Sequence, residues 1–511
     1  MESVHAGVRA VNPGAERMPV LVGIGEVTDR PADPQDSMEP LALMAEALRR
    51  ADEDAGGGWL AGLNSLDVVG QVTWRYDDLP ALLARRIGAS PKRLVNGPVG
   101  GETPIRMLHE AALRISAGAA DVAAIVGGES MYARAKAKEA GLVLPWTPMS
   151  AKDNRYDGLI ALHPLAKRLG ASIPAHIYPF YEIASQAHWG QTPEQARNES
   201  GALWGAFSRV AADNPYTWST QAKDSADIVT PSVGNRLIAW PYTKSMVANP
   251  NVNQGAAVLI CSLDRARRAG ITQDRLIYFH AGAAACEPQD YLQRDAYYHS
   301  VAQDAVLQGV LDEIGKKAAA IAYLELYSCF PCVPKMALRS LGLHADTAAT
   351  VTGGLSFFGG PLNNYMSHAV CAMTRRLRAD ADGFGLLYGQ GGFVNKHHTL
   401  ILGARPSERP LSPKYSVQEH ADAARGPVPP LINEYNGPAS LETFTILYDR
   451  TGVPTHGVAI ARVPAGQRLI AMVTAQDRDT LNVLTASDRS AVGQQGMVST
   501  LADSLLQWEV R

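Results

Sequence analysis

Strands and helices alternate along most of the chain, as its hydrophobic and polar positions show. Short apolar runs at Val20–Val27, Leu66–Val72 and Asp121–Val126 are typical of buried strands. Leu41–Ala51 and Pro104–Ala117 carry apolar residues at the three- and four-residue spacing of amphipathic helices. This alternation predicts an α/β fold with a largely parallel or mixed sheet.

A later stretch repeats the same order of elements. Val301–Lys316 predicts a helix that leads into the apolar strand Ala318–Leu326. Met366–Arg378 predicts a helix that leads into the strand Gly383–Tyr388 and then into a glycine-rich turn. A repeat of this length indicates a duplicated domain rather than a solenoid.

The segments between and after these halves have a different character. Residues 132–244 are rich in Pro, Trp, Tyr and Asn, which predicts an irregular inserted loop domain. After a proline-rich linker, short alternating runs separated by turns predict a small barrel of five strands. The predicted parts are an N-terminal half (1–131 plus 245–270), the insertion (132–244), a C-terminal half (271–404), the linker (405–433) and the barrel (434–511).

Composition and charge exclude several classes of protein. Lys and Arg number 47 against 50 Asp and Glu, so no basic field is present to hold nucleic acid or an anionic membrane. No apolar run approaches the roughly 18 residues of a spanning helix, and the N-terminus lacks the pattern of a secretory signal. Five cysteines in 511 residues are too few for a framework of disulfide bonds. We expect a cytoplasmic protein with neither a membrane span nor a nucleic-acid partner.

A set of ordered motifs resembles those of the sterol-carrier-protein-type thiolases. Glu325–Phe330 falls on their Glu-Leu-His-Asp-Cys-Phe motif, and Gly353–Leu362 on their Gly-Gly-Leu … Gly-His-Pro-Leu. Leu387–Gly392 is similar to their Cys-x-Gly-x-Gly-Gly turn, while Val126–Met131 and Asn253–Ala257 match strand ends of the first half. The chain therefore resembles the thiolase superfamily, and within it the branch called thiolase-like protein type 1.

This resemblance implies a fold and a ligand. The fold is a duplicated thiolase fold of two similar βαβαβ-type halves in five layers, α-β-α-β-α, with an inserted loop domain. A small OB-like barrel is appended in the type 1 branch. The implied ligand is a coenzyme A thioester, with no permanently bound cofactor and no metal. The implied assembly is a monomer or a homodimer, because the strand through which the family dimerises, Arg93–Asn96, is short here.

The chain departs from the family at its catalytic positions. Gly101 stands where the family has its nucleophilic Cys, and Gly360 where it has the His of Gly-His-Pro. Leu387 replaces the second Cys, and Tyr327 replaces the His of the first motif. The resemblance therefore argues against thiolase turnover through an acylated cysteine.

Other polar residues could rebuild the site. Cys329 could be a nucleophile, although a small buried thiol is the common alternative, and its Cys-x-x-Cys with Cys332 has no second ligand pair of zinc spacing. Asn364 and His368 share a helix face, where His368 could act as a base or an oxyanion donor. Helix capping and a satisfied core histidine are the alternatives.

The predicted site also includes four substrate-binding positions. Three hypotheses follow for the function of the protein. The catalytic candidates are Cys329, His368, Tyr327 and Asn364; the predicted substrate-binding residues are Gly101, Gly360, Tyr388 and Gly389. Lys396, His397 and His398 are expected at a solvated strand end. The chain is then an acyltransferase with a rebuilt site, a non-catalytic acyl-CoA-binding or assembly protein, or an aldolase-like lyase acting on a CoA thioester.

Overall fold

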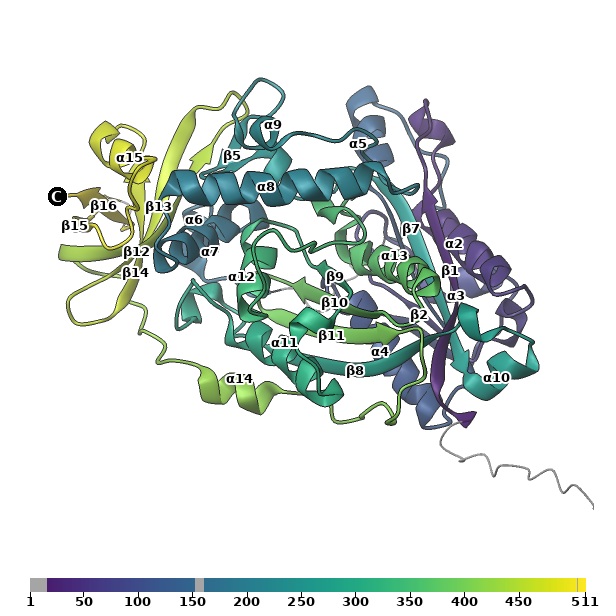
Figure 1. Cartoon of the computed structure of the whole chain (residues 1–511). Coiled ribbons are helices and arrows are strands. Elements are labelled where there is room, and N and C mark those ends of the chain that lie inside the picture. Colours follow the sequence, from purple (N-terminus) through teal and green to yellow (C-terminus); the bar gives the residue numbers. More distant parts are fainter. Residues whose placement is uncertain (1–15, 152–159, 503) are drawn as a thin grey trace, which may run out of the picture.

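A nine-stranded mixed sheet forms the centre of the molecule (Figure 1). The computed structural model describes residues 16–151, 160–502 and 504–511. In spatial order the strands are β3 (Arg93–Asn96), β2 (Ser65–Val68), β4 (Val122–Ser130), β7 (Asn253–Ser262), β1 (Pro19–Thr28), β8 (Ile277–Cys286), β11 (Lys396–Gly403), β10 (Phe384–Gly391) and β9 (Tyr323–Leu326). The predicted α/β class and the predicted duplication agree with this order, because each half runs outward from one of the two central strands, β1 and β8.

The two halves meet along a narrow seam. β1 and β8 pair antiparallel at Val20 and Leu21 only, whereas β1 and β7 pair along almost their whole length. Two helices, α4 (Thr103–Ser116) and α13 (Tyr365–Ala379), contact each other and strands of both halves. They form the buried middle layer, so the starts of both helices lie inside the molecule rather than on its surface.

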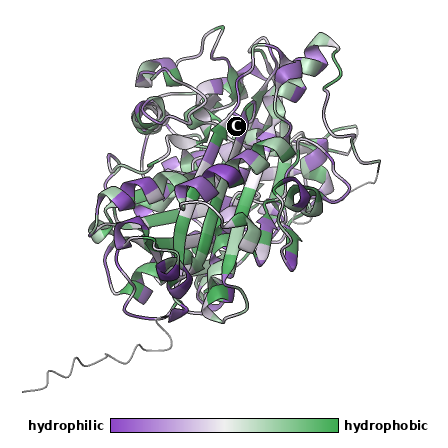
Figure 2. Cartoon of the chain, turned by 90° about the vertical axis from the view of Figure 1, so that its right-hand side faces the viewer, coloured by the Kyte–Doolittle hydropathy of each residue, from purple (hydrophilic) through white to green (hydrophobic). Residues whose placement is uncertain are grey.

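The outer layers are amphipathic helices. α2 (Pro40–Asp54) and α3 (Leu79–Arg86) cover the N-terminal half; α11 (Val301–Ile314) and α12 (Cys332–Ser340) cover the C-terminal half; α10 (Leu263–Arg268) lies at the edge. Figure 2 shows hydrophobic strands inside and helices with hydrophilic outer faces, as the helical periodicity predicts. Two predicted strands are shorter than expected: β2 ends at Val68, and Ala318–Ala320 is a 3-10 turn before β9.

The inserted segment is largely helical, so the prediction of an irregular loop domain was wrong. It contains α5 (Met131–Ala140), α6 (Pro164–Arg168), α7 (Pro174–His188), α8 (Pro193–Ala212), α9 (Ser225–Val229) and the strands β5 (Leu237–Ala239) and β6 (Tyr242–Thr243). α8 begins with a capping box between Thr192 and Gln195. Its packing face contains Gly201 and Gly205, which lie against Ser225 of α9, so apolar periodicity was a weak signal there.

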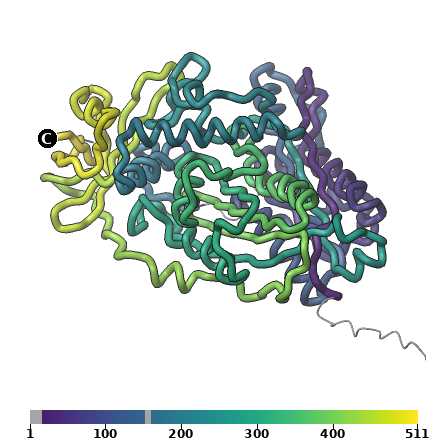
Figure 3. Tube along the Cα trace, viewed as in Figure 1, coloured from purple at the N-terminus to yellow at the C-terminus, as the bar shows by residue number. Residues whose placement is uncertain are grey.

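The C-terminal unit is the predicted five-stranded barrel, at the left of Figures 1 and 3. β12 (Gly437–Tyr448), β13 (Pro454–Arg462), β14 (Arg468–Thr474), β16 (Leu506–Val510) and β15 (Gln495–Thr500) pair in a ring that closes on β12. α15 (Arg478–Leu484) covers it, and α14 (Gln418–Ala424) lies in the linker. The barrel also pairs with the insertion, where Leu447 of β12 faces Ala239 of β5. The domain boundaries given in the sequence analysis stay a prediction.

No helix in the described residues is long and apolar enough to cross a membrane.

Candidate functional site

The loop before α4 holds the position that the resemblance assigns to the nucleophile. This loop is tied to its surroundings by Asn363, whose side chain accepts from the Gly100 amide at 3.1 Å and donates to the Gly70 carbonyl at 2.7 Å. Gly101 follows, one residue before Glu102, the N-cap of α4. The middle-layer position of α4 therefore places Gly101 in the interior of the protein.

Tyr327 occupies the space that a side chain at Gly101 would need. A Cβ atom added to Gly101 would overlap the Tyr327 hydroxyl and the backbone carbonyl of Gln390. Tyr327 is held there by its own amide, which donates to the Tyr388 carbonyl at 3.1 Å. The structure thus brings together two predicted site residues, Gly101 and Tyr327, and a tyrosine hydroxyl stands where a nucleophilic side chain would begin.

Glu102 lies beside this hydroxyl and was missed by the sequence analysis. Its side chain is 4% exposed, and its Oε2 has no hydrogen-bond partner within the described part of the chain. The same oxygen packs so closely on Gly100 and Gly391 that a Cβ at either glycine would overlap it. The signal in the sequence was an acidic residue directly after Gly101, at the start of a helix. A favourable interaction with the helix dipole explains an acidic residue at that place equally well.

Burial raises the pKa of both groups. For Glu102 it acts against the opposing effect of the Lys396 and Arg106 charges. Burial, followed by neighbouring Cys329 and Glu102, raises the pKa of Tyr327 well above its usual value. A phenol and a carboxyl group with raised pKa values therefore stand next to Gly101.

Cys329 is a buried neutral thiol. Gln390 Nε2 donates to its sulfur at 3.2 Å and to the Tyr178 hydroxyl at 2.6 Å. Burial raises the pKa of Cys329 to about 12, whereas reactive cysteines need a lowered pKa. The nucleophilic role of Cys329 stays a prediction that this environment disfavours. Both Cys329 and Cys332 are free, and the described residues contain no group of three or more His, Cys, Asp or Glu that could hold a metal.

His368 and Asn364 lie on the buried side of α13. His368 Nδ1 is 2.7 Å from Glu26 Oε1, Arg375 also pairs with Glu26, and His368 Nε2 has no partner in the described chain. Within the residues that the structure describes, the Asn364 amide also lacks partners at both atoms, and it packs against Gly127. No hydrogen bond joins His368 to Cys329 among the described residues, because their polar partners are different. A nucleophile–base pair made of these two residues therefore gains no support.

The predicted substrate-binding residues of β10 face opposite sides. Gly389 packs closely on Glu102 and Ile105 of α4, whereas the Tyr388 hydroxyl bonds Gln303 at 3.0 Å and His397 at 2.8 Å, towards α11. Adjacent strand residues alternate in this way, so only Gly389 shares the side of Gly101.

Gly360 lies in the backbone segment before α13. Its amide donates to the Asn249 carbonyl at 2.9 Å. A Cβ at Gly360 would lie 3.3 Å from that same carbonyl oxygen. This contact fixes the Gly-Gly-Pro turn against the end of the insertion.

The solvated strand end predicted at Lys396–His398 is a further correction. His397 and His398 are both buried, at 2% and 0% exposed. β11 lies between β8 and β10, and the helices α4 and α11 pack on its two faces. Burial lowers the pKa of His397 to about 4, which keeps this imidazole neutral.

The C-terminal part of the chain matches a family model, and the chain as a whole is similar to a solved structure. Residues 416–501 match the model of the thiolase-like protein type 1 additional C-terminal domain. The crystal structure of a monomeric SCP2-thiolase like protein type 1 from Mycobacterium smegmatis is similar over 97% of this chain and 99% of that chain, with 27% identity and a TM-score of 0.82. The resemblance to the thiolase-like type 1 branch is confirmed.

Two other solved structures share the fold over about three quarters of the chain. An Ltp2-ChsH2(DUF35) aldolase is 18% identical, with a TM-score of 0.57, over 76% of this chain and 98% of that one. The human mitochondrial 3-ketoacyl-CoA thiolase in complex with CoA is 14% identical, with a TM-score of 0.55, over 76% and 98%. No curated protein matches the chain.

Proposed function

We propose that this thiolase-like protein binds an acyl-CoA thioester and acts on it by acid–base chemistry, without an acylated cysteine. The reaction class that fits is cleavage or formation of a carbon–carbon bond next to the thioester carbonyl. The observation that carries the proposal is the Tyr327 hydroxyl in the side-chain space of Gly101, beside the buried carboxyl of Glu102.

Neutral hydroxyl donors suit the charge that such a reaction develops. When the bond between Cα and Cβ of a β-hydroxyacyl thioester breaks, its electron pair moves into the thioester as an enolate. Donors that stay protonated at neutral pH stabilise this enolate oxygen, and a buried tyrosine with a buried carboxylic acid is a known combination for that purpose. Tyr327 and Glu102 have the required chemistry.

A base must remove the proton of the β-hydroxyl group. His368 is the candidate, because its Nδ1 is bonded to Glu26 while its Nε2 has no partner in the described residues. A carboxylate on one ring nitrogen orients the ring and leaves the other nitrogen to accept a proton. After cleavage, a proton returns to Cα, which gives a shorter acyl-CoA and an aldehyde or ketone.

The test is turnover of 3-hydroxyacyl-CoA and deuterium exchange at Cα of acyl-CoA. We expect Tyr327→Phe and Glu102→Gln each to lower the rate by about 100-fold, since one oxyanion donor is worth that much. Cys329→Ser should keep the rate, as the matched control. An acyl mass found on the wild-type protein and lost in Cys329→Ser would instead make Cys329 the nucleophile of an acyltransferase.

A second candidate function is a non-catalytic acyl-CoA binder. The observation that favours it is the low exposure of Tyr327 and Glu102, 6% and 4%. Stabilisation of the protein by acyl-CoA, with neither exchange nor cleavage, would support this second function and contradict the first.

The remaining parts of the proposal concern place and assembly. We infer a cytoplasmic monomer that belongs to acyl-CoA and lipid metabolism. A monomeric relative with the same barrel supports the assembly state. Light scattering of the purified chain tests it, and a mass near 54.7 kDa is expected.

A further inference from the structure

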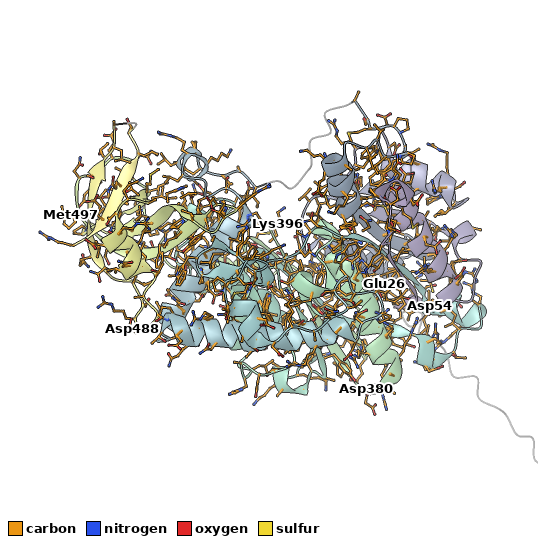
Figure 4. The ribbon with its side chains drawn as sticks, turned by 90° about the horizontal axis from the view of Figure 1, so that it is seen from above. Glu26, Asp54, Asp380, Lys396, Asp488 and Met497 are labelled. Carbon is orange, nitrogen blue, oxygen red and sulfur yellow. The ribbon has the colours of Figure 1, made fainter. Side chains whose placement is uncertain are left out.

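A cavity of about 730 Å³ opens beside Glu102, on the outer side of α4. Its walls are α4, the ends of β8 and β11, and linker residues 413–418. The linker is fixed there because the Ala284 amide donates to the Tyr415 carbonyl at 2.9 Å, and Val417 donates to Ala284 at 3.0 Å. Figure 4 shows Lys396, on one wall, between the barrel side of the molecule and the N-terminal strands. A cavity without an assigned role therefore lies next to Glu102, the acid group of the site.

The carboxyl groups of this cavity have other partners or a raised pKa. Glu287 pairs with Arg294 at 3.4 Å and with Arg425 at 3.2 Å. Glu110 is hydrogen-bonded to the Tyr415 hydroxyl. Burial raises the pKa of Glu102. In the part of the chain that the structure describes, none of the three makes an ion pair with Arg106.

Arg106 is a cationic residue of the cavity wall without an ion-pair partner among the described residues. Its side chain is half-buried, its Nε is fully buried without a hydrogen bond, and its guanidinium makes no ion pair with any described residue. A buried N–H without a hydrogen bond is costly, and a guanidinium matches a carboxylate or phosphate through two parallel hydrogen bonds. Arg106 lies four residues after Glu102, about 6 Å along α4. An anion on Arg106 would thus lie one helical turn from the acid group.

We propose that this cavity holds the acyl part of the substrate and that Arg106 binds a carboxylate at the end of that acyl group. The substrate class is then a short dicarboxylic acyl-CoA. A phosphate of CoA has the same chemistry, but the phosphates lie at the far end of the pantetheine arm from the thioester, while Arg106 lies next to Glu102. This inference rests on the proposed function and specifies its substrate.

The test compares acyl-CoAs of equal chain length with and without a terminal carboxylate. Calorimetric titration with succinyl-CoA against butyryl-CoA, and glutaryl-CoA against valeryl-CoA, gives a ratio of dissociation constants for each length. We expect the carboxylated ligand to bind at least about tenfold more tightly, the effect of one charged hydrogen-bonded pair. In Arg106→Gln the ratio should fall to about one, and Arg106→Lys should recover part of it. Arg85→Gln, an exposed arginine on α3, is the matched control and should keep the ratio.

The outcomes separate this inference from the proposed function. Equal binding of both ligands by the wild type overturns the carboxylate site and leaves acyl-CoA binding intact. A loss in Arg106→Gln that is equally large for CoA itself assigns the arginine to a phosphate and also overturns it. If no acyl-CoA binds, the proposed function fails as well.

An independent readout comes from Cys286. It lines the cavity and is the exposed cysteine of the chain, the other four being buried. Glutaryl-CoA should slow maleimide labelling of Cys286 in the wild type and not in Arg106→Gln. Unchanged labelling at saturating ligand would place the acyl group elsewhere.

Discussion

At the scale of single residues, the site depends on one glycine and the two side chains around it. Gly101 gives the room that the Tyr327 hydroxyl fills, and Glu102 closes the space on the other side. A nucleophilic cysteine could not be restored by substitution at residue 101 alone, because its Cβ would overlap the tyrosine. The tyrosine and the glycine therefore act as a pair.

Gly101→Ala should destabilise the protein. The added methyl group would meet Tyr327 and the rigid Gln390 carbonyl, and overpacking of this kind costs about 1–3 kcal/mol. Urea unfolding measures the change. Gly234→Ala is the matched control, because nothing lies within 4 Å of its added Cβ; equal stability of the two variants would contradict the assigned packing.

Only one of the five cysteines should react quickly with a thiol reagent. Cys286 is exposed, while the others are buried. With the pKa of Cys329 at about 12, its thiolate is scarce at pH 8, and its reactivity should rise with pH across the neutral range. Titration of native protein should show one fast thiol, which Cys286→Ser removes. Fast reaction of Cys329 would contradict its buried, protonated state.

The buried carboxyl of Glu102 should make stability depend on pH. Its folded pKa lies above the ordinary value of 4.5, so the folded state holds the proton more tightly than the unfolded state. The free energy of unfolding should therefore fall as pH rises from about 4.5 through the folded pKa. Urea unfolding between pH 4 and 9 measures this slope. Glu102→Gln should flatten it, and an unchanged slope in the variant would assign the effect to other groups.

At the scale of elements, α13 is fixed to β1 by one buried charge cluster. Glu26, 1% exposed, accepts from His368 and Arg375 of α13, and Figure 4 labels its place. The cluster holds the turn of α13 that carries His368 at the middle of the molecule. It joins a strand of the first half to a helix of the second.

Glu26→Gln should cost about 1–3 kcal/mol, because the amide replaces the carboxylate that accepts from the buried His368 ring and from Arg375, whose side chain is 35% exposed. Asp264→Asn is the control: it breaks the exposed Arg268–Asp264 pair, whose side chains are 66% and 41% exposed, and should cost less than about 1 kcal/mol. Thermal unfolding compares the two. A Glu26→Gln protein as stable as the control would show that the cluster does not hold the helix.

At the scale of the whole molecule, the barrel is joined to the thiolase-like body by a buried arginine. Arg468 of β14 is 0% exposed and donates to the Leu292 carbonyl at 2.8 Å and to Glu442 of β12 at 2.9 Å. Thr443 also donates to the Phe180 carbonyl of α7 at 2.7 Å. The barrel thereby covers α7 and the segment after β8.

Arg468→Met should loosen this contact. The linker at 405–433 then becomes accessible, and we expect protease to cut it about tenfold faster than in the wild type, as local opening costs less free energy. Arg478→Met, on the exposed side of the barrel, is the matched control. Equal cleavage rates in both variants would show that the barrel is held by other contacts.

The sequence by itself determined the layers, the duplication, the closed barrel and the glycine positions, because strand and helix periodicity and turn residues are local signals. It did not reveal the long helices α7 and α8 of the insertion, nor the burial of His397 and His398, which depends on the helices α4 and α11 that pack on β11. Tertiary structure alone decided the site: Tyr327 reaches the space of Gly101 from 226 residues away (327 − 101), and the linker meets α4 at the cavity that Arg106 lines. Contacts between distant segments carry no periodic signal in the chain, so they appear only when the fold brings the segments together.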